Sequence, residues 1–160
     1  SEPGKGSCFT ALFPASSLTP AARPGRGRVE GEPARPGDLV LVVDDEEVVR
    51  QLARRVLESH GVPVIEAESA TAALDLLARE GARVSVILLD LSMPGLSGAE
   101  ALPEFRRLHP GVRVLVSSGF GEDEVMSIFA GQKICGFIQK PYTTTRLLEA
   151  VRAALDSAPE

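Results

Sequence analysis

Aromatic side chains, cysteine and long apolar runs are all scarce in this chain of 160 residues. Aromatic residues make up 4% of the chain, so Val, Leu, Ile and Ala have to build any core. Cys8 and Cys135 form no Cys-x-x-Cys or Cys/His pattern, which favours two reduced thiols over a disulfide or metal scaffold. No apolar run approaches the ~20 residues of a membrane helix, and the N-terminus lacks the features of a secretory signal. We therefore expect a cytoplasmic location and no membrane contact by this segment.

The net charge and the length of the chain further limit the class of protein and its partners. The formal net charge of −5 argues against nucleic acid as the main partner, and 160 residues suit one ordinary domain plus an appendage. Residues 19–38 are rich in Pro, Gly and Arg, with Val29 as their only large apolar residue. Such a segment cannot bury enough apolar surface to offset its ordering entropy, which predicts a flexible linker. Its arginines could also form a nucleic-acid arm, but the interleaved Glu30 and Glu32 favour a solvated tether.

From residue 39 onward, apolar runs typical of β-strands alternate with segments of helical periodicity. The runs cover 39–43, 62–65, 84–89, 112–116 and 134–138. The helical segments cover about 49–57, 70–77, 102–108, 123–130 and 147–155. Because the strands are continuously apolar, both faces of the sheet should be covered by helices, as in parallel sheets. Five strand–helix units are too few for a TIM barrel and predict an open, doubly wound α/β sheet.

Polar residues stand at the ends of four of the five predicted strands. They are Asp44 and Asp45 after the first, Asp90 in the third, Ser117 and Ser118 in the fourth, and Lys140 after the fifth. The carboxyl ends of parallel strands share one edge, where such sheets bind their ligands, so these groups should converge. Two carboxylates ~4 Å apart repel by about 4 kcal/mol at an effective dielectric of ~20. Lys140 and a divalent cation would relieve that repulsion, and Mg²⁺ commonly bridges carboxylates to a phosphate.

Each of these residues also has an ordinary structural explanation. Asp44 or Asp45 alone could cap a helix that begins near Glu46, and Lys140 alone would be a surface lysine. Their coincidence at four strand ends instead favours a site for phosphoryl transfer. In such a site a carboxylate attacks phosphorus, while the metal and Lys140 neutralise the charge of the transferring group.

Four segments resemble, in order and spacing, the landmarks of bacterial response-regulator receiver domains. They read LVLVVDDEEVVRQLARRVL, VILLDLSMPGLSGAE, VLVSSGF and GFIQKPY. The resemblance covers about residues 39–157. It implies a flavodoxin-like (βα)5 fold, a doubly wound parallel sheet with strand order 2-1-3-4-5.

The resemblance also implies roles for the acidic residues. Asp90 matches the phosphoacceptor, which forms an acyl phosphate with a phosphoryl group from a kinase histidine. Asp45 matches a direct Mg²⁺ ligand, and Asp44 a second acid that acts chiefly through metal-bound water. The backbone carbonyl of Ser92 would be the third protein ligand, beside Asp45 and Asp90.

Three further residues match the phosphoryl partner and the switch of the family. Lys140 would pair with the phosphoryl group, and the peptide bond to Pro141 is expected to be cis. Ser118, followed by Gly119, matches the hydroxyl residue that reaches for the phosphoryl group, with Ser117 as the competing assignment. Phe137 matches the aromatic residue that turns inward on activation, although it could also be only a core residue of the last strand.

The N-terminal residues 1–18 resemble the last glycine box and strand of a histidine-kinase ATP-binding domain. The matching residues are Gly4, Gly6, Ser7, Phe9 and Phe13-Pro14, and a plain glycine-rich loop is the alternative. The resemblance implies that the chain is the C-terminal piece of a hybrid sensor histidine kinase. The other nucleotide boxes are missing, so this remnant is not expected to bind ATP.

The sequence therefore predicts a phosphoacceptor domain of a two-component phosphorelay that needs Mg²⁺ and is not itself an enzyme. Its expected partners are a histidine kinase or phosphotransfer domain and a downstream protein, because no DNA-binding segment follows the last helix. The alternative is a Mg²⁺-dependent phosphatase with an aspartate nucleophile. Such enzymes have a DxDx[TV] pattern after the first strand, where this chain has DDEE. A flavodoxin would need a Ser/Thr/Gly phosphate cradle there, which is also missing.

Overall fold

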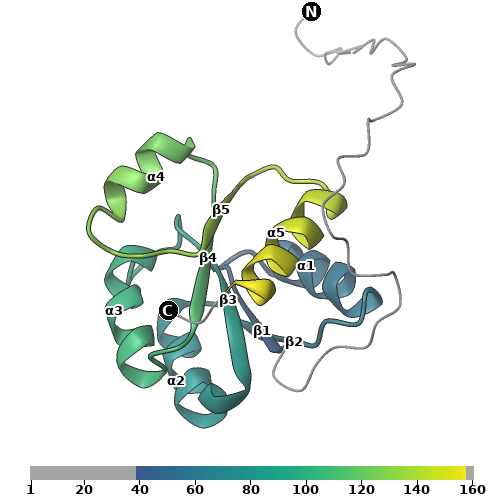
Figure 1. The fold of residues 1–160 in the computed structure, drawn as a ribbon, viewed down its shortest axis with the longest axis horizontal. Coiled ribbons are helices and arrows are strands. Elements are labelled where there is room, and N and C mark those ends of the chain that lie inside the picture. Colours follow the sequence, from purple (N-terminus) through teal and green to yellow (C-terminus); the bar gives the residue numbers. More distant parts are fainter. Residues whose placement is uncertain (1–38, 158–160) are drawn as a thin grey trace, which may run out of the picture.

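Five parallel strands form one sheet in the order β2-β1-β3-β4-β5 (Figure 1). The computed structural model describes residues 39–157. The strands are β1 (Leu39–Val43), β2 (Val64–Ala67), β3 (Val84–Asp90), β4 (Arg113–Ser118) and β5 (Gly136–Gln139). The expected flavodoxin-like strand order 2-1-3-4-5 is thereby confirmed, and the order reverses between β1 and β3.

Helices cover both faces of the sheet, as the continuously apolar strands predicted (Figure 1). The helices are α1 (Glu47–Ser59), α2 (Ala70–Glu80), α3 (Gly98–Leu108), α4 (Glu122–Ile128) and α5 (Thr144–Asp156), with a short 3₁₀ turn η1 (Gly81–Arg83) before β3. Apolar residues of α2, α3 and α4 pack on one face, in a cluster that includes Phe105 and Phe129. Residues of α1 and α5 pack on the other, around Leu57 and Val151. No helix in this described part is long and apolar enough to cross a membrane.

Element boundaries differ from the apolar pattern by a few residues. β2 begins at Val64 rather than 62, because Pro63 has no N–H to give to the ladder, although its carbonyl accepts the N–H of Val40 at 3.0 Å. β3 and β4 extend to Asp90 and Ser118, so polar residues predicted at strand ends belong to the strands themselves.

The start of α3 is fixed by a capping box, and its middle contains a proline. Ser97 Oγ accepts the N–H of Glu100, whose carboxylate accepts the N–H of Ser97. Pro103 has no N–H for the carbonyl of Ala99, four residues earlier. The side-chain amide of Gln132 donates to that carbonyl at 3.4 Å and supplies the missing partner.

The predicted kinase remnant, residues 1–18, and the predicted linker, residues 19–38, lie outside the described residues. Those two predictions therefore stay predictions. The expected receiver boundaries of 39–157 stay a prediction as well.

Candidate functional site

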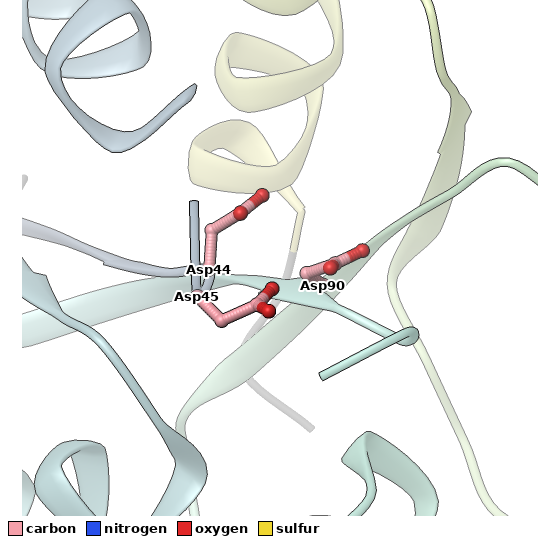
Figure 2. Close-up of side chains that lie close together, drawn as sticks. All are labelled: Asp44, Asp45 and Asp90. Atoms are coloured by element: carbon pink, nitrogen blue, oxygen red, sulfur yellow. The ribbon is translucent and has the colours of Figure 1, made fainter. Parts of the chain in front are cut away.

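Two neighbouring strands place three aspartates at the carboxyl edge of the sheet. β1 pairs with β3 so that Val43 lies beside Leu89. Asp90 ends β3, and Asp44 and Asp45 directly follow β1. Figure 2 shows the three side chains next to one another at these strand ends.

The three carboxylates are close enough to share one cation. An oxygen can be chosen from each of Asp44, Asp45 and Asp90 so that all lie within 4.8 Å of one another. Mg²⁺ binds oxygen at about 2.1 Å, so two ligands of one ion lie roughly 3 to 4 Å apart. Asp44 and Asp90 are buried and Asp45 is exposed, so the cluster opens to solvent on the side of Asp45.

Lys140 lies against the buried half of this cluster. Its Nζ donates to Asp44 Oδ2 at 2.7 Å and forms an ion pair with Asp90 Oδ1 at 3.1 Å. Burial alone would lower the pKa of the ammonium, but the hydrogen bond to Asp44 and the charges of both aspartates outweigh it and raise that pKa. Lys140 is therefore held as a cation beside Asp90. The Lys140–Pro141 bond is cis, as expected.

Asp90 combines burial with an oxygen that no donor occupies. Among the described residues, Asp90 Oδ1 has no hydrogen-bond partner, because the 3.1 Å contact with Lys140 is an ion pair without hydrogen-bond geometry. Burial raises the pKa of this carboxyl, Lys140 opposes that effect, and the charge of Asp44 adds to it, so the pKa is raised overall. An oxygen with free lone pairs, 3.1 Å from an ammonium, is available to a metal ion or an electrophile.

Asp44 and Asp45 differ in how far their side chains are already occupied. Asp44 Oδ1 accepts the N–H of Glu46 at 2.9 Å, and its Oδ2 accepts Lys140. Glu46 is the N-cap of α1 and makes no side-chain capping bond, so Asp44, which accepts its N–H, supports the start of the helix, whereas Asp45 makes no such bond in the described part of the chain. The exposed Asp45 carboxylate is the one better placed for direct metal binding.

The loop between β3 and α3 passes beside this cluster. Gly95 has a φ of +86°, a left-handed conformation that favours glycine. A Cβ on Gly98 would come within 3.3 Å of the Asp90 carbonyl, so α3 approaches the end of β3 closely. The backbone of Ser92 favours the ionised Asp90 carboxyl and lowers its pKa, which partly offsets the effect of burial.

Ser117 and Ser118 point to opposite faces of the sheet. Ser117 is the register partner of Asp90, and its Oγ is buried without a hydrogen-bond partner in the described part of the chain. Ser118 Oγ is fully buried and accepts the N–H of Phe120 at 3.1 Å. Because side chains alternate along a strand, Ser118 shares a face with Val116, whose register partner on β5 is Phe137.

Phe137 lies between the core and a groove. It packs half-buried against the cluster under α2, α3 and α4. It also lines a groove with Glu122 of α4, Gln139 of β5 and Arg146 of α5. Its position fits both open interpretations, a core residue and a side chain that changes position.

Two residues near the cluster were given no role from the sequence. Arg50 of α1 donates to the backbone carbonyls of Asp44 and Asp45. Tyr142, largely enclosed beside Lys140, has the pKa of its hydroxyl raised by burial. The sequence signal for Arg50 is its place one turn into the helix that follows the two aspartates.

Comparison with known proteins places this chain in one family. The model of the response regulator receiver domain matches residues 40–152. The chain therefore belongs to the response regulator receiver domain family, whose members are signalling domains of two-component systems that bind Mg²⁺ at an acidic cluster.

Relatives share the receiver but differ in length. The chain is 32% identical over 164 residues to the sensor kinase CckA of Brucella abortus, covering 98% of this chain and 17% of that protein. It is 40% identical over 121 residues to the hydrogenase transcriptional regulatory protein HoxA of Cupriavidus necator, covering 74% of this chain and 24% of HoxA. The chemotaxis protein CheY of Bacillus subtilis is 29% identical over 120 residues, with 73% and 97% covered.

Solved receiver structures have the same fold. A receiver domain protein from Clostridium thermocellum is 28% identical with a TM-score of 0.68, covering 74% of this chain and 94% of that one. The receiver domain of NtrX from Brucella abortus is 30% identical with a TM-score of 0.67, covering 74% and 99%.

Proposed function

We propose that this receiver accepts a phosphoryl group from a kinase histidine on Asp90, with Mg²⁺, and passes the signal to a protein partner by a change of conformation. The observation that carries the proposal is the exposed edge of an otherwise buried acid cluster. Three carboxylates meet there within 4.8 Å, and Asp90 Oδ1 lies beside Lys140 without a hydrogen-bond donor.

The residues of the cluster fit a Mg²⁺ ion. Asp45, Asp90 and the backbone carbonyl of Ser92 would be the direct ligands, and Asp44 would act through water because Lys140 and Glu46 already occupy its oxygens. The ion would supply positive charge to the transferring phosphoryl group. The donor set consists of hard oxygens, and an unoccupied buried oxygen on Asp90 supports the fit.

Phosphoryl transfer would form one bond and break one bond. An Asp90 oxygen attacks phosphorus, the bond between phosphorus and the donor imidazole nitrogen breaks, and that nitrogen keeps the electron pair. Lys140, held as a cation, neutralises charge on the phosphoryl oxygens. The product is an acyl phosphate on Asp90.

The switch would run from Ser118 to Phe137. The phosphoryl group brings negative charge and three acceptor oxygens to the end of β3. Ser118 can donate to one of them by moving inward, and Phe137, on the same face of the next strand, would fill the vacated space. The groove beside Phe137 between α4, β5 and α5 would be the surface that responds.

We further infer that the parent protein is a hybrid sensor histidine kinase acting in the cytoplasm. The match to the sensor kinase CckA covers 98% of this chain, so it must include most of residues 1–38 as well as the receiver. The HoxA and CheY matches cover 74% and 73%, about the receiver alone. This difference supports the interpretation of residues 1–18 as the end of a kinase ATP-binding domain.

Acetyl phosphate with Mg²⁺ tests the proposal without knowledge of the natural kinase. Intact mass spectrometry should find a single added phosphoryl group, and hydroxylamine should remove it, as expected of an acyl phosphate. Omission of Mg²⁺ should abolish the labelling. Labelling that resists hydroxylamine, or that needs no metal, would contradict the proposal.

A further inference from the structure

Arg50 reaches from α1 back to the loop that carries two of the three clustered aspartates. Its Nη1 donates to the backbone carbonyl of Asp44 at 2.6 Å and to that of Asp45 at 3.0 Å. One guanidinium nitrogen with two N–H groups thus joins two consecutive peptide units. The side chain is half-buried, so solvent only partly competes for these bonds.

Other bonds on this loop hold Asp44. The N–H of Asp44 donates to the Ala67 carbonyl at 3.2 Å, and its carboxylate accepts Glu46 N–H and Lys140 Nζ. Asp45 is exposed, and the N-cap Glu46 makes no side-chain capping bond. The bond from Arg50 extends the support of the loop to Asp45, the aspartate best placed for direct metal binding.

We propose that Arg50 is a positioning residue for Mg²⁺ binding, which holds the backbone of Asp45 so that its carboxylate faces Asp90. The inference rests on the proposed function, because it requires that the acidic cluster takes Mg²⁺. Removal of a group that orients a metal ligand typically weakens metal binding about ten- to a hundredfold.

Because Arg50 is charged, the direction in which its removal changes the Kd for Mg²⁺ shows which role the residue has. A cation near the cluster repels Mg²⁺, so loss of its charge alone would tighten metal binding. Loss of its hydrogen bonds would loosen the loop and weaken metal binding. A positioning role therefore predicts a higher Kd for Mg²⁺ in Arg50→Ala, and a purely electrostatic role predicts a lower one.

Arg54 offers a control that is matched in charge. It lies one turn further along α1, pairs with Glu58 at 3.0 Å and lies 4.0 Å from Glu66. Arg54→Ala removes the same charge from the same helix without touching the loop. Arg50→Lys keeps the charge and part of the bonding, so its Kd should fall between those of the wild type and Arg50→Ala.

Titration with MgCl₂ alone, followed by amide NMR, measures the Kd of each variant. We expect Arg50→Ala to raise the Kd about ten- to a hundredfold and Arg54→Ala to change it less than about twofold. Amide hydrogen exchange at Asp45 and Glu46 should be faster in metal-free Arg50→Ala than in the wild type. An unchanged or lower Kd in Arg50→Ala, or an equal rise in Arg54→Ala, overturns the inference.

The wild type and Asp45→Ala are measured in the same series. They distinguish a failure of the proposed function from a failure of the role of Arg50 alone. If the wild type does not bind Mg²⁺, the proposed function fails. If the wild type binds, Asp45→Ala does not, and Arg50→Ala equals the wild type, only the role of Arg50 fails. Should Arg50→Ala not fold, Arg50→Lys decides alone: a raised Kd supports positioning by the guanidinium, and a Kd equal to that of the wild type overturns it.

Discussion

Opposing electrostatic effects act on the ionisation of the Asp90 carboxyl. Burial and the nearby charge of Asp44 disfavour its ionised form, whereas Lys140 and the backbone of Ser92 favour it. The balance leaves the pKa of Asp90 above its ordinary value. Folding therefore favours the protonated carboxyl, and the ionised carboxylate destabilises the fold at neutral pH.

Replacement of Asp90 by asparagine should stabilise the fold at neutral pH. The amide keeps the shape of the side chain and removes a buried charge, while Lys140 retains its 2.7 Å bond to Asp44. Without Mg²⁺, which would favour the wild-type carboxylate, we expect a gain of about 1–2 kcal/mol at pH 7 in denaturant unfolding. The gain should shrink as the pH falls through the raised pKa, because wild-type Asp90 then becomes neutral too.

Asp75→Asn is the control for this prediction. Asp75 is exposed on α2, away from the acid cluster, so the loss of its charge should change stability by less than about 0.5 kcal/mol. Equal stability of Asp90→Asn and the wild type at pH 7 would contradict the assigned cost of ionising Asp90.

At the scale of elements, the periodic pattern was enough to predict each strand and helix but not where each one ends. Continuous apolar runs identified β1 and β3, whose side chains are buried on both faces. The ends depend on individual hydrogen bonds that an apolar pattern does not reveal, such as the ladder bond that Pro63 cannot donate because it has no N–H. The proximity of Asp44, Asp90 and Lys140 could be predicted from their positions at the carboxyl ends of parallel strands. Arg50 could not be found that way, because its partners are backbone carbonyls and its only sequence signal is its place one turn into α1.

The partnership between Pro103 and Gln132 can be tested by a double-mutant cycle. Gln132→Ala should destabilise the protein by about 1 kcal/mol, because the Ala99 carbonyl loses its donor. In a Pro103→Ala background the residue at 103 has its own N–H for that carbonyl, so Gln132→Ala should cost clearly less. Urea unfolding of the four proteins measures the coupling, and equal costs in both backgrounds would show that the contact does not replace the missing helix bond.

The proposed relay between β4 and β5 predicts different effects for the two neighbouring serines. Beryllofluoride, a phosphoryl mimic, should shift amide NMR signals from about 118 to 148 in the wild type. In Ser118→Ala the shifts should be confined to the surroundings of Asp45, Asp90 and Lys140, because the link to Phe137 is lost. Ser117→Ala, on the opposite face, should keep the distant shifts. The reverse result would assign the relay to Ser117.

For the molecule as a whole, the described residues 39–157 contain the five strands and five helices of the receiver fold. Residues 19–38 have Val29 as their only large apolar residue, so they offer little apolar surface to pack. We therefore expect deletion of residues 1–36 to change the thermal midpoint by no more than about 2 °C, measured by circular dichroism. A fall of many degrees would mean that the N-terminal segment packs on the receiver.

The position of the phosphoryl group tests directly whether Asp90 is the phosphoacceptor. After incubation with acetyl phosphate and Mg²⁺, borohydride reduces an aspartyl phosphate to homoserine, and peptide mass spectrometry locates the changed residue. We expect homoserine at position 90, with Asp44 and Asp45 unmodified. Homoserine at 44 or 45 would place the nucleophile after β1, as in the phosphatase alternative, and would contradict the account.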